Sequence, residues 1–409
     1  MELIADYFNR SSNEHADYSM ESNVVGATYD KSNLNLWKFK ADFLYPRSRR
    51  LSWKFGASVQ WISSTFTPSA TLENDRFNVS DIPTETTGVT PIVYAAAQGM
   101  FWKLRYSAGI NWQLNRISYE NRDAGVRNHN TQWAINPTIQ IMMPFGSKMN
   151  HALMLSYKKT LSDIPYSAIS SVINWDNAYS YTVGNPDLKA QSADMVMVGL
   201  SLLKNKINIT ALYAHSHDRI YWETFQSEEN QEVFYTKPVN ISGQGVWGFG
   251  MEWIEAPLGW WKFKLSGRIE ITPENTTIAN IHYGKTRIKE YFYFNNNFRF
   301  PNGWGGMVNV NFEPTYRTLD RTYHAVYNVN GQIYKSFLND NLQIAVDFTP
   351  IGNRRKLDRY AGMNKVSYKY ITPVQYVGLS FTWNFSGGKQ VNVNVVDGIQ
   401  DYHETKDNR

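Results

Sequence analysis

Apolar and polar residues alternate one by one along most of this chain. In the segment 51–63, Trp53, Phe55, Val59 and Trp61 are separated by serine, lysine, glycine and glutamine. A period of two places all the apolar side chains on one face of an extended strand. The pattern therefore predicts an amphipathic β-strand with one apolar and one polar face.

The same alternation recurs as far as residue 385. The stretches run roughly 10 to 14 residues, which is longer than the usual strand of a soluble protein and matches a tilted strand that crosses a membrane. The clearest of them are 101–115, 133–145, 247–253, 261–271, 304–316, 342–348 and 377–385. Length and period together favour membrane-spanning strands.

Short and long connections alternate between these stretches. The short connections predicted from Gly, Pro, Asn and Asp are 46–50, 98–100, 145–149, 204–206, 256–259, 301–303 and 338–340. The long ones are 63–88, 118–130, 161–190, 223–242, 272–287 and 351–372, with a shorter one at 317–321. Outer-membrane barrels have short periplasmic turns and long extracellular loops in this order. We predict an all-β fold, a transmembrane antiparallel up-and-down β-barrel with about 16 strands.

Composition agrees with a barrel wall. Aromatic residues make up 15% of the 409 residues, as expected for girdles at the two membrane interfaces. The mean hydropathy of −0.46 and the absence of any run of 18 apolar residues exclude transmembrane helices. There is no cysteine, which excludes disulfides and thiolate sites. The net charge of +5 is scattered, so the sequence gives no indication of nucleic-acid binding.

Three elements of the sequence resemble a known family. They are a strand, proline turn and return strand at 40–53, the stretch Gly184, Asn185, Pro186, Asp187, Leu188, Lys189 and Ala190 followed by Gln191, and a closing strand at 379–385 with a short extension. They resemble the outer-membrane β-barrel family common in Bacteroidetes, whose barrels are similar to those of TonB-dependent receptors. Gln191 stands where that family more often has Glu.

The resemblance implies a longer protein. Members have a plug domain, an energy-coupling segment and, by analogy with TonB-dependent receptors, 22 strands, so we expect about 16 of 22 strands here. The segment Met1–Tyr7 has no features of a secretion signal, and we favour a fragment that begins inside a longer chain. The expected domains are residues 1–385 as the C-terminal part of the barrel and 386–409 as a polar periplasmic tail.

One loop combines aromatic residues with Asn and Asp. Tyr166, Trp175, Tyr179 and Tyr181 lie within 161–190, and aromatic faces with amides and carboxylates nearby suit a siderophore, glycan or peptide. The alternative is that these rings belong to the outer aromatic girdle. Both interpretations remain open from sequence alone.

Other motifs favour structural interpretations. Residues 243–248 match GxGxxG but lead into a strand rather than a helix, so we assign them to strand packing. His215 and His217 share a strand face without a third ligand, and Glu228–Glu229 is interpreted as a solvated loop tip, so we predict no metal site. No nucleophile elbow, P-loop or zinc-protease motif occurs. We predict neither catalytic residues nor a cofactor.

The expected function is that of an outer-membrane receptor or transporter barrel, which binds a small ligand at extracellular loops for uptake into the periplasm. Its partners would be outer-membrane lipid and lipopolysaccharide, which the basic residues Arg122, Arg127 and Arg354–Lys356 would contact. A plug domain and an energy-coupling protein would join it in a full-length form. The alternatives are a stand-alone porin-like channel and an outer-membrane barrel enzyme.

Overall fold

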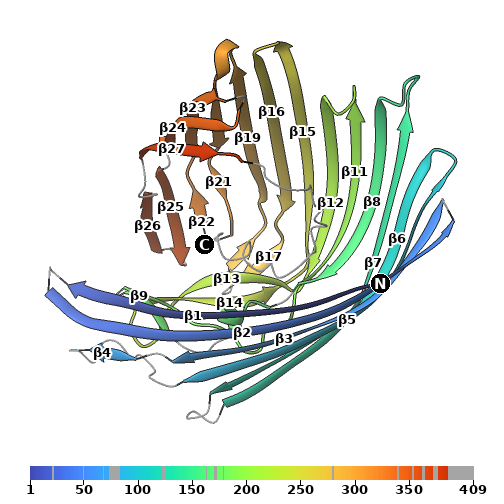
Figure 1. The fold of residues 1–409 in the computed structure, drawn as a ribbon. Helices are drawn as coiled ribbons and strands as arrows, with labels where there is room; N and C mark the ends of the chain where they lie inside the picture. The colour runs from blue at the N-terminus through green and yellow to red at the C-terminus, as the bar shows by residue number, and fades with distance from the viewer. Residues whose placement is uncertain are drawn as a thin grey trace.

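The computed structural model of the protein consists almost entirely of β-strands (Figure 1). It describes residues 1–385 except 21–22, 49, 68, 73–82, 122–125, 163, 170–172, 178, 279–280, 320, 339, 352–353, 362–363 and 372–375. The predicted tail at 386–409 lies outside the described residues. Among those described, no helix is long and apolar enough to span a bilayer.

The main sheet contains 17 strands, of which the three-residue β4 (Ala70–Leu72) is a short addition to β2, leaving sixteen long strands. Each long strand pairs antiparallel with the next one along the chain. The long strands are β1 (Glu2–Met20), β2 (Asn23–Ser48), β3 (Leu51–Thr67), β5 (Thr84–Phe101), β6 (Leu104–Asn121), β7 (Val126–Phe145), β8 (His151–Leu161), β11 (Ser192–Leu202), β12 (Ile207–His217), β15 (Gln244–Leu258), β16 (Trp261–Pro273), β19 (Thr286–Arg299), β20 (Trp304–Glu313), β23 (Val326–Phe337), β24 (Leu342–Ile351) and β27 (Val377–Trp383). The predicted fold class and strand number are confirmed.

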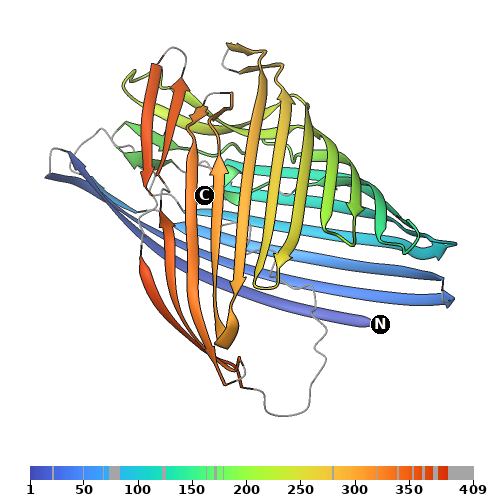
Figure 2. The ribbon, with the colours of Figure 1, turned by 90° about the horizontal axis from the view of Figure 1, so that it is seen from above.

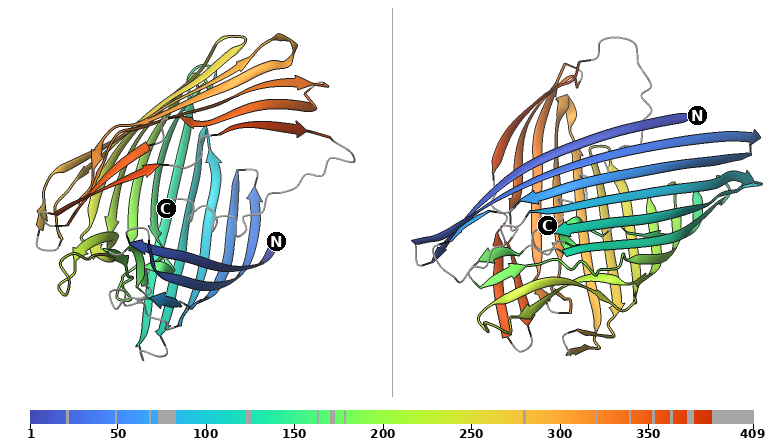
Figure 3. Two further views of the ribbon diagram at one scale, coloured as in Figure 1. Left: turned by 90° about the vertical axis from the view of Figure 1, so that its left-hand side faces the viewer. Right: turned by 90° about the horizontal axis from the view of Figure 1, so that it is seen from below.

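The sheet curls around a central space, and its two end strands do not meet (Figures 1 and 3). Among the described residues, β1 pairs only with β2 and β27 only with β24. A barrel must pair every strand on both sides to satisfy the backbone in lipid. The gap between β1 and β27 is consistent with the expected total of 22 strands, which stays a prediction.

The outer face of the sheet is apolar and aromatic. Large apolar side chains remain exposed along it, and in one row the register places Tyr7, Trp37 and Trp61 side by side on β1, β2 and β3. Ring centroids of Tyr7 and Trp37 are 4.3 Å apart. Exposure of rings at this density identifies the surface that faces lipid and its interfaces.

The first strands are longer than the alternation of apolar residues predicts. Apart from the short β4, the strands β1 to β7 have 17 to 26 residues, whereas we expected 10 to 14. The turn predicted at 98–100 lies at Trp102–Lys103. Beyond the apolar band the strands continue in polar residues such as Asn33, Ser63 and Thr87, which still pair. Backbone pairing needs no apolar side chain, so the pattern ends before the strand does.

Most of the long connections at one rim contain further strands (Figure 2). One four-stranded sheet joins β9 (Asn174–Asn177), β10 (Ser180–Thr182), β13 (Arg219–Gln226) and β14 (Phe234–Ile241). Another joins β21 (Tyr316–Arg317), β22 (Arg321–Tyr323), β25 (Arg354–Ala361) and β26 (Asn364–Ile371). A hairpin of β17 (Thr276–Ile278) and β18 (Ile281–Tyr283) completes the set. By the alternation of short and long connections, this rim is extracellular.

Candidate functional site

The connection between β8 and β11 has a small hydrophobic core of its own. Its turn of helix α1 (Tyr166–Ile169) contributes Ala168 and Ile169, which pack with fully buried Leu188. These side chains rest on Ile117 and Tyr119 of β6. Because both β6 residues belong to the polar face of the alternation, their apolar side chains mark where the loop docks on the inner wall.

Two asparagines fasten this loop to its neighbours. Asn185 donates through Nδ2 to the carbonyl of Pro238 at 3.0 Å, and its own Oδ1 accepts the N–H of Asp187 at 3.2 Å. Asn240 of β14 accepts the N–H of Lys189 at 2.8 Å and donates to the Lys189 carbonyl at 2.9 Å. Side chains therefore form hydrogen bonds with backbone groups of Asp187 and Lys189, which lie outside any β-ladder.

The hairpin of β13 and β14 leaves the barrel wall at Asp218. This residue has φ of 49°, in the left-handed region, and its carbonyl accepts a hydrogen bond from Asn240 Nδ2 at 2.8 Å. Asp tolerates this conformation better than most residues do. The turn separates β12, which pairs in the wall, from β13, which pairs in the rim sheet.

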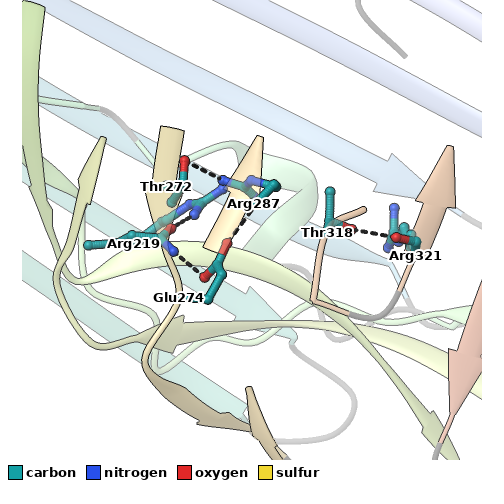
Figure 4. A network of polar contacts seen from close by, with 7 residues as sticks. Arg219, Thr272, Glu274, Arg287, Thr318 and Arg321 are labelled. Carbon is teal, nitrogen blue, oxygen red and sulfur yellow. Dashed lines mark hydrogen bonds and ion pairs between the residues drawn. The ribbon is translucent and has the colours of Figure 1, made fainter. Parts of the chain in front are cut away.

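A buried ionic network holds the base of that hairpin (Figure 4). Arg287 lies 3.2 Å from Glu274 through Nη1 and donates to Thr272 Oγ1 at 3.3 Å through Nη2. Arg219 donates to Gln244 Oε1, and Gln244 donates in turn to Glu274. Burial, followed by the nearby Arg287, lowers the pKa of Arg219 below its usual value. The two guanidinium groups share one carboxylate away from bulk water.

The two rim sheets are also joined to each other. Arg321 of β22 donates to the carbonyl of Trp222 at 3.0 Å, and Arg359 of β25 donates to Thr236 Oγ1 at 3.3 Å. Arg321 and Arg359 are opposite one another in the register of β22 and β25. Segments separated by about a hundred residues in sequence thus form one connected layer.

An aromatic row crosses the first rim sheet. The register aligns Trp175 of β9, Tyr181 of β10, Tyr235 of β14 and Phe225 of β13. Tyr235 stacks on Tyr181 with centroids 5.4 Å apart and on Phe225 at 5.2 Å. Burial first, and then acidic and phenolic neighbours, raise the pKa of both tyrosines above their usual value of 10.0. Tyr181, Tyr235 and Phe225 therefore form one stacked row across the sheet.

The predicted ligand residues lie in and beside this row. Tyr181 and Trp175 are both members, but the side chain of Trp175 lies outside the described residues, as does that of Tyr166 at the start of α1. Tyr179 is 50% exposed, and its carbonyl accepts the N–H of Phe234 at 2.8 Å. Sequence reasoning missed Tyr235 and Phe225, because only the sheet register aligns them with the other two.

The family-motif residues have structural surroundings. Gly184 and Leu188 are buried, Pro186 is half-buried and Lys189 is exposed, with its backbone held by Asn240. Asn130 of β7 donates to the Leu188 carbonyl, and Gln132 accepts the N–H of Ala190 at 2.7 Å. The motif joins the loop to β7 and β14, a contact that sequence alone does not show.

The histidine pair faces the outer surface. His217 Nε2 lies 3.3 Å from Asp194 Oδ2, and Asp194 Oδ1 accepts a hydrogen bond from Tyr157 at 2.7 Å. The rings of His215 and His217 are 4.6 Å apart. Over the described residues there is no group of three His, Asp or Glu side chains placed to hold a metal.

The glycines of residues 243–248 make room for side chains of β12. A Cβ on Gly243 would lie 2.8 Å from His215 Nε2, and one on Gly245 would lie 2.9 Å from Tyr213 Oη. A Cβ on Gly248 would lie 2.8 Å from Leu212. The motif supports packing between strands, in agreement with the sequence interpretation.

Comparison with known proteins identifies the family. The family model described as "Outer membrane protein beta-barrel family" matches residues 2–383. The chain therefore belongs to this family and is an outer-membrane protein. No curated protein matches the sequence.

Solved structures share the fold at low sequence identity. The ferric yersiniabactin uptake receptor FyuA from Yersinia pestis is 10% identical, with a TM-score of 0.60 over 90% of this chain and 56% of that one. The copper transporter OprC is 10% identical, with a TM-score of 0.62 over 90% and 62%. The hemophore receptor HasR from Serratia marcescens, solved with its hemophore HasA and heme, is 10% identical, with a TM-score of 0.58 over 90% and 66%. The chain thus spans little more than half of the length of the first of these proteins.

Proposed function

We propose that this chain is the wall and extracellular rim of an outer-membrane receptor, which binds a ligand at the rim and passes it inward for uptake. The observation that carries the proposal is the connected layer of rim sheets, with the row formed by Tyr181, Tyr235 and Phe225 on it. A simple diffusion pore needs no such layer. The fold shared with uptake receptors supports the same function.

The ligand class is proposed as a siderophore, a glycan or a peptide. Tyr166, Trp175, Tyr179 and Tyr181 are the proposed contact residues, and Tyr235 and Phe225 join them because of the row. Aromatic edges and hydroxyls next to Glu228 and Glu229 suit a ligand with both an apolar face and polar groups. Binding would be non-catalytic.

The full-length protein is proposed to include a plug domain and to engage an energy-coupling protein. Lipopolysaccharide is the proposed lipid partner. Arg127 is exposed at the outer end of β7, and a cation there suits lipid phosphates. Lys356 is instead 3.5 Å from Asp358. The side chains of Arg354 and Arg355, and all of Arg122, lie outside the described residues.

A binding screen tests the proposal. Reconstituted protein would be titrated with ferric siderophores, heme, oligosaccharides and short peptides. The same titrations would be repeated with Tyr181→Ser, Tyr235→Ser and the control Tyr327→Ser, an exposed tyrosine of β23 in the wall that is not part of the rim sheets. We expect one class to bind, with at least tenfold weaker binding to the two rim variants, since each loses part of an aromatic contact. Steady conductance in planar bilayers without binding of any class would contradict the proposal and indicate a pore.

A further inference from the structure

A cavity at the opposite, short-turn end has a chemistry that the rim does not share. It has a volume of about 480 Å³ and is lined by Ser48, Arg50, Leu51, Ser52, Gln98, Gly99, Met100, Arg105, Tyr106, Ser107, Gln140 and Met142. These residues come from the end of β2, the turn before β3, and β3, β5, β6 and β7. The register shows how they are arranged.

Two neighbouring rows of inward side chains form the floor. The upper row is entirely polar, because Ser52 pairs with Gln98, Gln98 with Ser107, and Ser107 with Gln140. In the lower row the Arg50 carbonyl accepts the N–H of Met100 at 2.9 Å, Met100 pairs with Arg105, and Arg105 pairs with Met142. The positions between the two rows, among them Leu51 and Ile141, belong to the outward-facing set, so both rows face the lumen.

The lower row therefore presents two arginines with a methionine between them. The backbones of Arg50 and Arg105 are two strand spacings apart, roughly 10 Å. Across this distance the two guanidinium groups can both reach a single bound group that lies between them. Both side chains are exposed. Within the described part of the chain, neither guanidinium has a hydrogen-bond or ion-pair partner, and no carboxylate lines the cavity.

The adjoining wall adds positive charge. Lys54 lies two residues beyond Ser52 on the same face, where it and Lys40 share the single carboxylate of Asp42, at 3.2 Å and 3.3 Å. One negative charge for two lysines leaves this part of the wall cationic. The unpaired arginines of the cavity thus lie in a positive field that attracts anions.

We propose that this cavity is an anion-binding site at the inner mouth of the lumen, which takes a group with at least two carboxylates or phosphates bridged between Arg50 and Arg105. Arginine forms two parallel hydrogen bonds to such groups. The Ser52, Gln98 and Ser107 side chains supply further donors. The anion has two possible sources, a small solute in the lumen or acidic side chains of a polypeptide seated there.

Titration of the folded chain in detergent at low salt tests the site. The probes are inorganic pyrophosphate for the first source and a hexaglutamate peptide for the second. The variant Arg50→Gln/Arg105→Gln should weaken binding of the effective probe at least tenfold, because it removes both charged fork donors. The matched control is Lys103→Gln, which removes a neighbouring charge that lies over the Trp102 ring at 5.1 Å and does not line the cavity.

The outcomes separate the two sources. Tighter binding of pyrophosphate assigns the site to a small solute, and tighter binding of hexaglutamate assigns it to a polypeptide. Arg105→Lys keeps the positive charge but loses the paired hydrogen-bond donors of the guanidinium group, so its affinity should lie between those of the wild type and the double variant. This single variant tests the proposal if the double variant does not fold. The proposal is overturned if neither probe binds, or if Lys103→Gln weakens binding as much as the loss of the arginines. It does not depend on the rim function, since these probes test only the inner mouth.

Discussion

Leu188 is fully buried in the loop core, so its replacement by alanine should release the loop without unfolding the barrel. Truncating a buried leucine costs about 2.7 to 5 kcal/mol, depending on how far the cavity collapses. The loop is held to the wall by this core and by hydrogen bonds with Asn130 and Gln132, and Asn240 holds it to the rim hairpin. We therefore expect Leu188→Ala to lower mainly the free energy of releasing the loop from the wall, with little change in the free energy of unfolding the barrel.

That cost corresponds to an opening constant raised about 10² to 5×10³-fold, at roughly 1.4 kcal/mol per tenfold. Amide hydrogen exchange measures it directly. The N–H groups of Asn185 and Ala190, which donate to Ala168 and Gln132 in the docked loop, should exchange faster by that factor. Amides in the middle of β8 and β11 should keep their rates, because their partners lie in the wall.

The control is Leu258→Ala, at an exposed position near the opposite rim, which should leave loop exchange unchanged. The reasoning fails if Leu188→Ala accelerates exchange equally in the loop and in β8, because the loop would then not be a separate unit. It also fails if the loop rates do not change, because the core would then contribute nothing to docking.

Two further perturbations test other parts of the wall and rim. Gly56→Ala places a Cβ directly against the Tyr94 ring, so it should displace the ring from Asp42 at a cost of about 1 to 3 kcal/mol. The thermal midpoint measured by circular dichroism should fall. Gly259→Ala, with nothing within 4 Å, should leave the midpoint unchanged, and equal midpoints for the two variants would contradict the packing argument. The raised pKa of Tyr235 means that the folded rim holds this proton more tightly than the unfolded chain, so the stacked row is stable below pH 10 and loses stability above it. In an ultraviolet titration, Tyr235→Phe should remove a tyrosinate component that forms above the usual pH, and loss of an ordinary component would refute the assignment.

The wall was predictable from sequence because each outward position carries its own apolar signal. Trp53, Phe55 and Trp61 indicate the strand and its apolar face without reference to distant residues. The polar outer ends of the long strands were not predictable in this way, because residues such as Asn33 pair through the backbone alone.

The rim was predictable only in part. Tyr181 could be proposed as a ligand residue from its aromatic character, whereas Tyr235 required the parallel pairing of β10 with β14, two segments about fifty residues apart. The same holds for Asn185, whose partner is the carbonyl of Pro238. The inner-mouth cavity is a similar case, since the relation of Arg50 to Arg105 exists only in the sheet register.

The bonds between the rim sheets have a kinetic consequence. Arg321 and Arg359 join one rim sheet to the other, and Asn240 of β14 bonds to the carbonyls of Lys189 and Asp218. A solute whose entry requires one of these segments to move must therefore wait until several of them move together. The open population is then small, and the apparent affinity falls in proportion to it. At high solute concentration the observed rate of entry would reach a ceiling set by the rim itself, independent of how much solute is supplied.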